Sequence, residues 1–368
     1  MNKTLLAAAL IVGFAGAAQA ETSVTLYGIL DTGYGYQNYK YDGNLATGDI
    51  TRNSSGVRDG VINGNRFGLR GSEDLGDGLR AIFRLEQGFN IGDGTGSSDR
   101  QFHRQAWVGL SSDNWGSLTV GRQYNMGNTF TNEANATVVM GDIDKAFGGV
   151  GSSNRMDNSF KYVTPSFSGF QAGIAYGNPD TEIYRDGSGT QPDESDRSNW
   201  LSTGIGYSNG PLTVGLNYDR QSGGGGNDVT SWAIGGAYDF EVVKLHLAYG
   251  QDRDGKMGWG DLGEDFRSDL SLSAPGEDFK SDNYYVALSA PVGGGTLVGA
   301  WTRTSSNLDD RTDAWADAAG SQNVYYMQYK YPLSKRTSLY GYASYGTNLS
   351  YIQDLDGTEA GIGINHKF

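Results

Sequence analysis

The sequence of 368 residues contains no cysteine and only seven prolines. The absence of cysteine excludes disulfide bonds, thiolate catalysis and cysteine-ligated metal sites. Hydrophobic residues make up only 37% of the chain, which would give a soluble protein of this length a small core. Acidic residues outnumber basic ones by 42 to 28, and this balance argues against a nucleic-acid partner. Beyond the first twenty residues no apolar run is long enough for a membrane-spanning helix.

Glycine and tyrosine are abundant, with 57 and 23 copies. Glycine is at roughly twice its usual share, and tyrosine rings suit the headgroup boundary of a bilayer. A transmembrane β-barrel needs little apolar sequence, because one face of its wall meets lipid and the other meets water. Its closed hydrogen-bonded sheet also supplies the rigidity that disulfides would otherwise give.

The first twenty residues have the pattern of a signal peptide. Asn2 and Lys3 precede the apolar stretch LLAAALIVGFAGAA, and Ala18-Gln19-Ala20 is an A-x-A cleavage site. The alternative is a membrane anchor, but the apolar run is too short. We therefore expect a signal peptide at 1–20 and a barrel domain at 21–368.

From Val24 onward, large apolar residues recur at every second position. Within 231–240, Trp232, Ile234, Tyr238 and Phe240 share one face, and small or polar residues occupy the other. This period of two indicates β-strands, and apolar-out, polar-in alternation is its transmembrane form.

The pattern predicts an all-β fold, a 16-stranded antiparallel transmembrane β-barrel. Bacterial barrels place short turns in the periplasm and long loops outside, and the links between the expected strands alternate in this way. We expect strands at about 22–38, 58–72, 78–90, 99–112, 116–124, 157–165, 169–178, 198–208, 211–220, 230–240, 242–251, 282–291, 294–305, 322–333, 336–347 and 357–368.

One long link contains a repeat, GEDFRSD at 263–269 and GEDFKSD at 276–282. A local duplication in a tolerant surface loop explains it most simply. An acidic site for a cation or a partner is the alternative.

Several segments together resemble the general porins of Gram-negative bacteria, especially the β-proteobacterial type. They are TSVTLYGILDTGYGY, GNRFGLRGSEDLGDGLRAIFRLEQGF, RQAWVGLSSDNWGSLTVGRQY, DNSFKYVTPSFSGFQ and the terminal GIGINHKF, and they span the chain after residue 21. The resemblance implies an outer-membrane, water-filled channel for passive diffusion of small hydrophilic solutes and ions, without a cofactor or metal. It also implies a homotrimer in contact with outer-membrane lipid and lipopolysaccharide.

The same resemblance implies a pore constriction with basic wall residues opposite acids on a third loop folded into the pore. Matching wall positions are Arg66, Arg70, Arg104 and Lys161. Successive residues of a strand face opposite sides of the wall. Phe67 and Leu69 take the outward face, so the alternation places Arg66 and Arg70 inside, as the resemblance requires. For Arg104 we place Trp107 on the opposite, outward face. Four wall cations near a narrow lumen lead us to expect a weak preference for anions.

The third loop, about 125–156, contains the acids Glu133, Asp142 and Asp144. It lacks the proline of the acidic motif found in enterobacterial porins, so which acid reaches the lumen stays open.

Two residues are assigned outside the pore. Arg122 shares parity with Leu118 and Val120, and a bare arginine in lipid costs up to about 2–4 kcal/mol. The resemblance implies that subunit contacts lie on these early strands, and we therefore assign Arg122 to the trimer interface. The terminal Phe368 lies on the outward face, and the resemblance makes the last strand the signal for the barrel-assembly machinery.

Three other functions are weighed against the porin. An enzyme barrel needs a catalytic base, and of the three histidines only His246 is expected to face inward, with no nucleophile elbow nearby. A substrate-specific channel would need an aromatic ladder, which inward residues such as Tyr27 and Tyr326 could supply. An adhesin would conduct no ions.

Overall fold

The structure is a computed structural model that describes residues 22–44, 49–132, 154–178, 198–223, 228–255, 266–273 and 276–368. Within these ranges the chain forms one antiparallel sheet of 17 strands. The bounds are β1 Ser23–Tyr41, β2 Ile50–Asp59, β3 Arg66–Gly76, β4 Leu79–Gly88, β5 Gln105–Ser112, β6 Gly116–Tyr124, β7 Arg155–Val163, β8 Phe170–Gly177, β9 Ser198–Asn209, β10 Leu212–Gly223, β11 Val229–Asp239, β12 Lys244–Arg253, β13 Lys280–Val292, β14 Gly295–Ser306, β15 Gln322–Pro332, β16 Thr337–Thr347 and β17 Leu355–Lys367.

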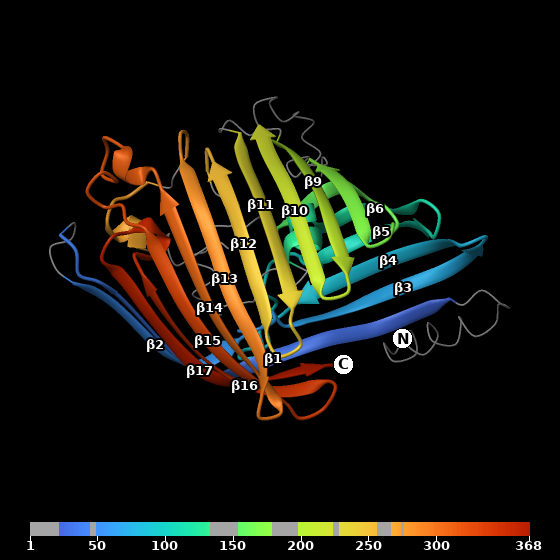
Figure 1. Ribbon diagram of the computed structural model, residues 1–368, viewed down its shortest axis with the longest axis horizontal. Coiled ribbons are helices and arrows are strands. Elements are labelled where there is room, and N and C mark those ends of the chain that lie inside the picture. The colour runs from blue at the N-terminus through green and yellow to red at the C-terminus, as the bar shows by residue number, and fades with distance from the viewer. Residues whose placement is uncertain are drawn as a thin grey trace, which may run out of the picture.

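The sheet closes on itself into a barrel. Strand β1 pairs with β17 along thirteen register positions, from Ile29 opposite Lys367 to Tyr41 opposite Leu355. In Figure 1, β9–β14 stand side by side in the front wall, and β3–β6 form the wall behind them. Among the strands described here, closure pairs each one on both sides except β2, which pairs with β1 alone; a paired edge is what a strand in lipid needs.

The wall has sixteen positions, because β2 and β3 occupy one of them. Both pair with β1: β2 with its second half and β3 with its first half. The expected count of sixteen is confirmed. The continuous second strand expected at 58–72 is wrong, since residues 60–65 leave the sheet between β2 and β3.

Alternation places apolar side chains outside and polar ones inside. On β1, Leu26, Tyr34 and Tyr36 are exposed on the outward face, whereas the inward Asp31 and Gln37 are buried. The same division recurs on β12, where Leu247 is exposed and His246 is buried. The outer wall can therefore face lipid, and the inner wall is lined by groups that hydrogen bond.

The links between strands are sorted by length, as expected. One end of the barrel has short turns, such as 77–78, 210–211 and 293–294, and the other has the long links, such as 89–104, 254–279 and 307–321. Two boundaries differ from expectation. The first long link is shorter, because β1 runs to Tyr41 and β2 begins at Ile50. The strand expected from residue 99 begins only at Gln105.

Three long links pack together at the loop end. Leu308 begins the short helical turn η3 (Leu308–Asp310), and Leu349 and Tyr351 bound the turn η4 (Leu349–Tyr351). All three side chains are buried in one apolar cluster with Trp315. Both copies of the repeated segment bury their phenylalanines, Phe266 and Phe279, in this cluster. The repeat therefore has a packing role in the described residues.

Among the residues described, no helix is long and apolar enough to cross a membrane.

Candidate functional site: a basic cluster on the inner wall

Arg66 and Arg104 come together on the inner wall. Arg66 is the first residue of β3, and Arg104 immediately precedes β5. The Arg66 Nε donates to the carbonyl of Gly64 at 2.9 Å. A Cβ built on Gly64 would lie 3.1 Å from Arg104 Nη1 and 3.9 Å from Arg66 Nη2, so the two guanidinium groups flank this glycine. Two of the expected wall cations are therefore neighbours.

Glu86, on β4, lies within this cluster and was not predicted as a site residue. Its Oε1 accepts a hydrogen bond from Arg104 Nε at 2.8 Å, and its Oε2 accepts one from the Tyr27 hydroxyl at 2.8 Å. Only 2% of Glu86 is exposed. The carboxylate therefore neutralises part of the positive charge from within the wall.

Arg155, the first residue of β7, is a further cation that was not predicted. Its guanidinium lies over the ring of Tyr124, 4.4 Å from the ring centroid, and donates to the Tyr124 hydroxyl. Arg104 Nη2 donates to the same hydroxyl at 3.3 Å. Tyr124 thus joins Arg104 and Arg155, and we define Arg66, Arg104, Arg155 and Glu86 as the basic wall cluster.

Arg70 extends the positive charge along β3. It lies opposite Arg84 in the register of β3 and β4, and both guanidinium groups lie near the Tyr27 ring, at 5.4 and 5.9 Å. Arg84 also lies 5.8 Å from the ring of Trp107. Trp107 is therefore inward, and the outward placement expected for it is wrong. Arg104 precedes β5, so strand parity does not govern it.

Lys161 points inward, but it holds the root of the third loop. Its Nζ donates to the carbonyl of Tyr124 at 3.1 Å and to the Thr129 hydroxyl at 2.7 Å. Thr129 belongs to the short helical turn η1 (Asn128–Asn132). Lys161 therefore contacts the loop through Thr129 and the backbone of Tyr124, the residue whose hydroxyl joins Arg104 and Arg155.

The root of the third loop packs against the inner wall on a floor of glycines. Met126 and Phe130 are buried with Met156 and Trp200. Cβ atoms built on the wall glycines would come too close to this segment: within 2.8 Å of Met126 at Gly173, and within 2.5 and 2.6 Å of Phe130 at Gly204 and Gly206. A glycine floor lets the backbone of the loop approach the wall.

Buried hydrogen bonds fix the same segment to β9 and β10. The Met126 amide donates to Ser202 Oγ at 2.8 Å, and Asn125 Nδ2 donates to Asp219 Oδ1 at 2.9 Å. Asp219 also accepts from Trp200 Nε1 at 3.1 Å. Residues 125–132 therefore lie inside the barrel against the wall formed by β8–β10, two to four strands along from β6.

The three loop acids expected at the constriction, Glu133, Asp142 and Asp144, lie outside the described residues. The signal peptide expected at 1–20 lies outside them as well.

Arg122 faces outward on β6, as parity predicted, but it is not a bare charge. Its Nη1 pairs with Asp157, and its Nε donates to the carbonyl of His103. Asp157 also pairs with Arg100 at 2.5 Å. A partner within the chain removes much of the energetic reason for placing Arg122 in a subunit interface.

Phe368 completes the closure of the barrel. The backbones of Phe368 and Gly28 exchange two hydrogen bonds, at 3.0 and 3.1 Å. A Cβ on Gly28 would lie 2.3 Å from the Phe368 ring, so the ring covers the glycine.

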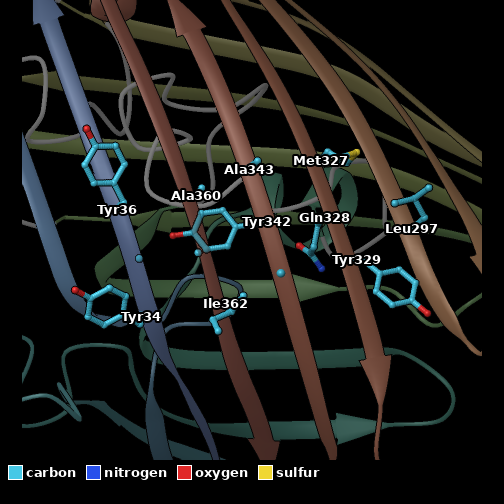
Figure 2. Close-up of a pocket in the computed structure, with 13 residues that line it drawn as sticks. Tyr34, Tyr36, Leu297, Met327, Gln328, Tyr329, Tyr342, Ala343, Ala360 and Ile362 are labelled. Carbon is cyan, nitrogen blue, oxygen red and sulfur yellow. The ribbon is translucent and has the colours of Figure 1, made fainter.

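The outer wall has an apolar hollow, shown in Figure 2. Tyr34, Tyr36 and Met327 border small residues, Ala343 and Ala360, on the outward face of β1 and β15–β17. This hollow lies on the lipid-facing side and is separate from the pore.

The described residues hold no group of three or more His, Asp or Glu that could bind a metal. His246 faces inward, as expected, and contacts the Ser289 hydroxyl at 3.2 Å.

Comparisons with known proteins place these features in context. The model of the Gram-negative porin family matches residues 7–350. The chain is 43% identical to an outer membrane porin protein of Bordetella pertussis over 100% of both chains, and 32% identical to outer membrane porin protein 32 of Delftia acidovorans over 98% of this chain and 92% of that one. Among solved structures, the anion-selective porin from Comamonas acidovorans matches 95% of this chain and 100% of its own, with 26% identity and a TM-score of 0.69.

Proposed function

This chain belongs to the Gram-negative porin family and is an outer-membrane porin, and from that premise we propose that its basic wall cluster makes the channel weakly anion-selective. The resemblance expected from the sequence is thereby confirmed, together with the barrel fold and the outer-membrane location. Small hydrophilic solutes and ions diffuse through the lumen without a cofactor or an energy source.

The observation that carries the proposal is the excess of cations over anions on one part of the inner wall. Arg104 pairs with Glu86, Arg66 lies beside Arg104, and Arg155 is joined to Arg104 through Tyr124. Arg70 and Arg84 extend the charge along β3 and β4. Cationic side chains lining a pore favour anions. The Comamonas relative, which is described as anion-selective, has the same fold.

The constriction proposed here retains Arg66, Arg70 and Arg104 as its basic side. Lys161 contributes through the loop root that it holds, and Arg155 joins the basic side. We keep Asp142 and Asp144, with Glu133, as the acids opposite. Opposed rows of charge would create a transverse field that orients polar solutes and disfavours apolar ones.

The test replaces both Arg66 and Arg104 with Ser and measures the reversal potential in a KCl gradient. A unit charge about 4 Å from a passing ion changes its energy by about 1 kcal/mol in water, or roughly fivefold in local ion concentration. The reversal potential should shift in the direction of greater cation permeability, and the channel should still conduct. The matched control is Arg220→Ser, which removes an exposed arginine paired with Asp228. If the wild-type protein, the combined arginine variant and Arg220→Ser have the same reversal potential, Arg66 and Arg104 do not determine selectivity.

The lumenal tyrosines support a general channel over a sugar-specific one. Tyr326, Tyr340 and Tyr342 face inward, but each is less than 10% exposed. The hydroxyls of Tyr326 and Tyr340 bond to Gln328 and Asp31. Rings that are covered in this way have no free face on which a sugar could stack. Saturable block of the current by a sugar would contradict this interpretation.

We propose that the protein has no enzymatic activity. His246 faces inward and bonds to Ser289 across the antiparallel pair of β12 and β13, which is not the strained strand-to-helix turn that carries a catalytic serine. Hydrolysis of a lipid or peptide by the purified protein would refute this.

We also propose a homotrimer whose neighbours contact the wall from β1 to β6, with lipopolysaccharide and lipid covering the remainder, and assembly through the barrel-assembly machinery. Exposed apolar side chains on this wall, including Leu26, Leu69 and Val120, need a cover of protein or lipid. Since Arg122 pairs with Asp157, the proposal depends mainly on family membership. A purely monomeric mass in mild detergent would refute it.

A further inference from the structure

The second wall position is interrupted by an inward bulge. Asp59 of β2 lies opposite Thr32 of β1, and Arg66 of β3 lies opposite Ile29. Two residues of β1, Leu30 and Asp31, therefore face the six residues 60–65. The residues in excess form a bulge that separates β2 from β3, and this bulge ends at Arg66.

Asp31 is bonded to the bulge at several points. Its amide donates to Asn65 Oδ1, and its carbonyl accepts from the Gly60 amide at 2.8 Å. Its Oδ2 accepts from the Asn63 amide at 3.1 Å. Both ends and the middle of the bulge are therefore attached to one residue of β1.

The wall on the other side of β1 secures the same carboxylate. Asp31 Oδ1 accepts from the Tyr340 hydroxyl at 2.7 Å, and Oδ2 accepts from Asn365 Nδ2 at 2.8 Å. Asp31 is completely buried. Its two oxygens satisfy three donors at once, which an amide of the same shape cannot do because one of its two groups is itself a donor.

The far side of the bulge meets the basic wall cluster. The Gly64 carbonyl accepts the hydrogen bond of Arg66 Nε, and a Cβ built on Gly64 would lie 3.1 Å from Arg104 Nη1. Val61 is 3% exposed and packs in the apolar cluster, which fixes the other part of the bulge. Movement of the bulge would therefore displace both guanidinium groups.

We propose that Asp31 is a positioning residue for ion selectivity: it holds the bulge 60–65 in the lumen, and the bulge sets where Arg66 and Arg104 present their charge. This inference rests on the proposed function, because it assumes that these arginines determine selectivity. Asp31 itself does not meet the permeating ion.

The first experiment measures reversal potentials in a KCl gradient for Asp31→Ala, for the combined Arg66→Ser and Arg104→Ser variant, and for all three substitutions together. Asp31→Ala should shift the reversal potential by at least about half as much as the combined arginine variant does, and it should add little when both arginines are already replaced, since coupled residues are not additive. Additive shifts would overturn the inference. The matched control is Asp252→Ala, a buried inner-wall carboxylate that bonds Ser281 and Asn283 away from the bulge; an equal shift there would also overturn it.

A second measurement separates failure of the inference from failure of the proposed function. The chain has no cysteine, so a spin label at Ile62→Cys reports the order of the bulge alone. Asp31→Ala should raise the label's mobility and Asp252→Ala should not. If the bulge is mobile in Asp31→Ala, and selectivity is unchanged both in that variant and in the combined Arg66→Ser and Arg104→Ser variant, the proposed function is refuted. A rigid bulge in Asp31→Ala refutes the inference.

Tyr340→Phe covers the case in which Asp31→Ala fails to fold. It removes one hydrogen bond to Asp31 and leaves the ring in place. We expect a smaller shift of the reversal potential in the same direction, and no shift would overturn the inference.

Discussion

Arg104 and Glu86 form an ion pair inside the barrel wall, with Nε and Oε1 separated by 2.8 Å and side-chain exposures of 11% and 3%. The pair lies beside Arg66, so the local charge is positive even with the carboxylate included. Because both groups are sheltered from water, their charges are screened less than those of a surface pair. Glu86 therefore sets how much of the positive charge reaches the lumen.

Replacing Glu86 with Gln should make the channel more anion-selective. The amide keeps the shape and one acceptor for Tyr27 or Arg104, but it removes the negative charge. Reversal potentials in a KCl gradient should show that the ratio of chloride to potassium permeability rises, by roughly severalfold. Glu241→Gln, in the short turn after β11, is the control and should change little. A shift towards cations would mean that Glu86 does not offset the arginines.

The same variant should be less stable. Removing one partner of a buried ion pair typically costs about 3–5 kcal/mol, and the amide that remains should reduce this loss. The thermal unfolding temperature in detergent should fall, and it should fall less in Glu86→Gln than in Glu86→Ala. Equal losses would show that hydrogen bonding by the amide contributes nothing.

The glycine floor predicts a second effect, on conductance. A Cβ at Gly215 would lie 1.8 Å from the Phe130 carbonyl oxygen, so Gly215→Ala should push the loop root away from the wall at a cost of about 1–3 kcal/mol. Single-channel conductance should change and become noisier. Gly299→Ala is the matched control, because a Cβ there has no neighbour within 4 Å. The same conductance in both variants would show that the loop root does not shape the pore.

The barrel could be predicted from the sequence because two solvents impose its alternation. Lipid outside and water inside force a period of two along every strand, and the short turns separate the strands clearly. The assignments of Phe67 and Leu69 to the outside and of Arg66 and Arg70 to the inside follow from this rule, and the structure agrees with them.

The bulge at 60–65 could not be predicted from the same rule. The bulge has six residues where β1 has two, so it inserts four extra residues into this wall position. Because four is an even number, the alternation of faces is the same before and after the bulge. Val57 and Phe67 are accordingly both exposed on the outward face. The alternation of apolar and polar residues therefore gives no sign of this insertion. The bulge depends instead on Asp31 and Asn65, whose bonds no local pattern reveals.

Tertiary contacts also explain the differences within the site. Parity could place Glu86 inside, but its partners Tyr27 and Arg104 are 59 and 18 residues away in sequence. The outward placement of Trp107 is wrong because it follows from counting parity through Arg104, which lies one residue before β5 begins. Strand parity predicts the face of a side chain and leaves its partner undetermined.

His103, in the link before β5, predicts a pH effect. Burial, and then the positive charges of Arg104, Arg155 and Arg122, lower the pKa of His103 below its ordinary value. A lowered pKa means that the unfolded chain takes up the proton first as the pH falls. The stability that neutral His103 contributes is thus complete above about pH 6.5 and is lost as the pH falls through the lowered pKa.

Thermal unfolding measured between about pH 7 and pH 5 should reveal this effect. The wild-type protein should lose more stability over this interval than His103→Gln, which cannot take up the proton. Parallel curves for the two proteins would show that His103 does not contribute to the pH dependence.

The closure between β1 and β17 gives the last prediction. Phe368 exchanges two backbone hydrogen bonds with Gly28, and its ring occupies the space above that glycine. The ring thus shields the last hydrogen bonds of the seam, where the two ends of the sheet must meet before the barrel is closed. Phe368→Ala should therefore slow closure more than it lowers final stability, and refolding from urea into detergent should be severalfold slower.

Gly28→Val should also slow refolding, because the valine side chain would displace the Phe368 ring. Ile364→Ala removes a side chain of equal exposure, 41%, from the outward face of β17, the strand that ends one residue before Phe368. It is the matched control for the loss of outward apolar surface. If Ile364→Ala slows refolding as much as Phe368→Ala does, the effect belongs to the apolar surface in general and the seam has no special role.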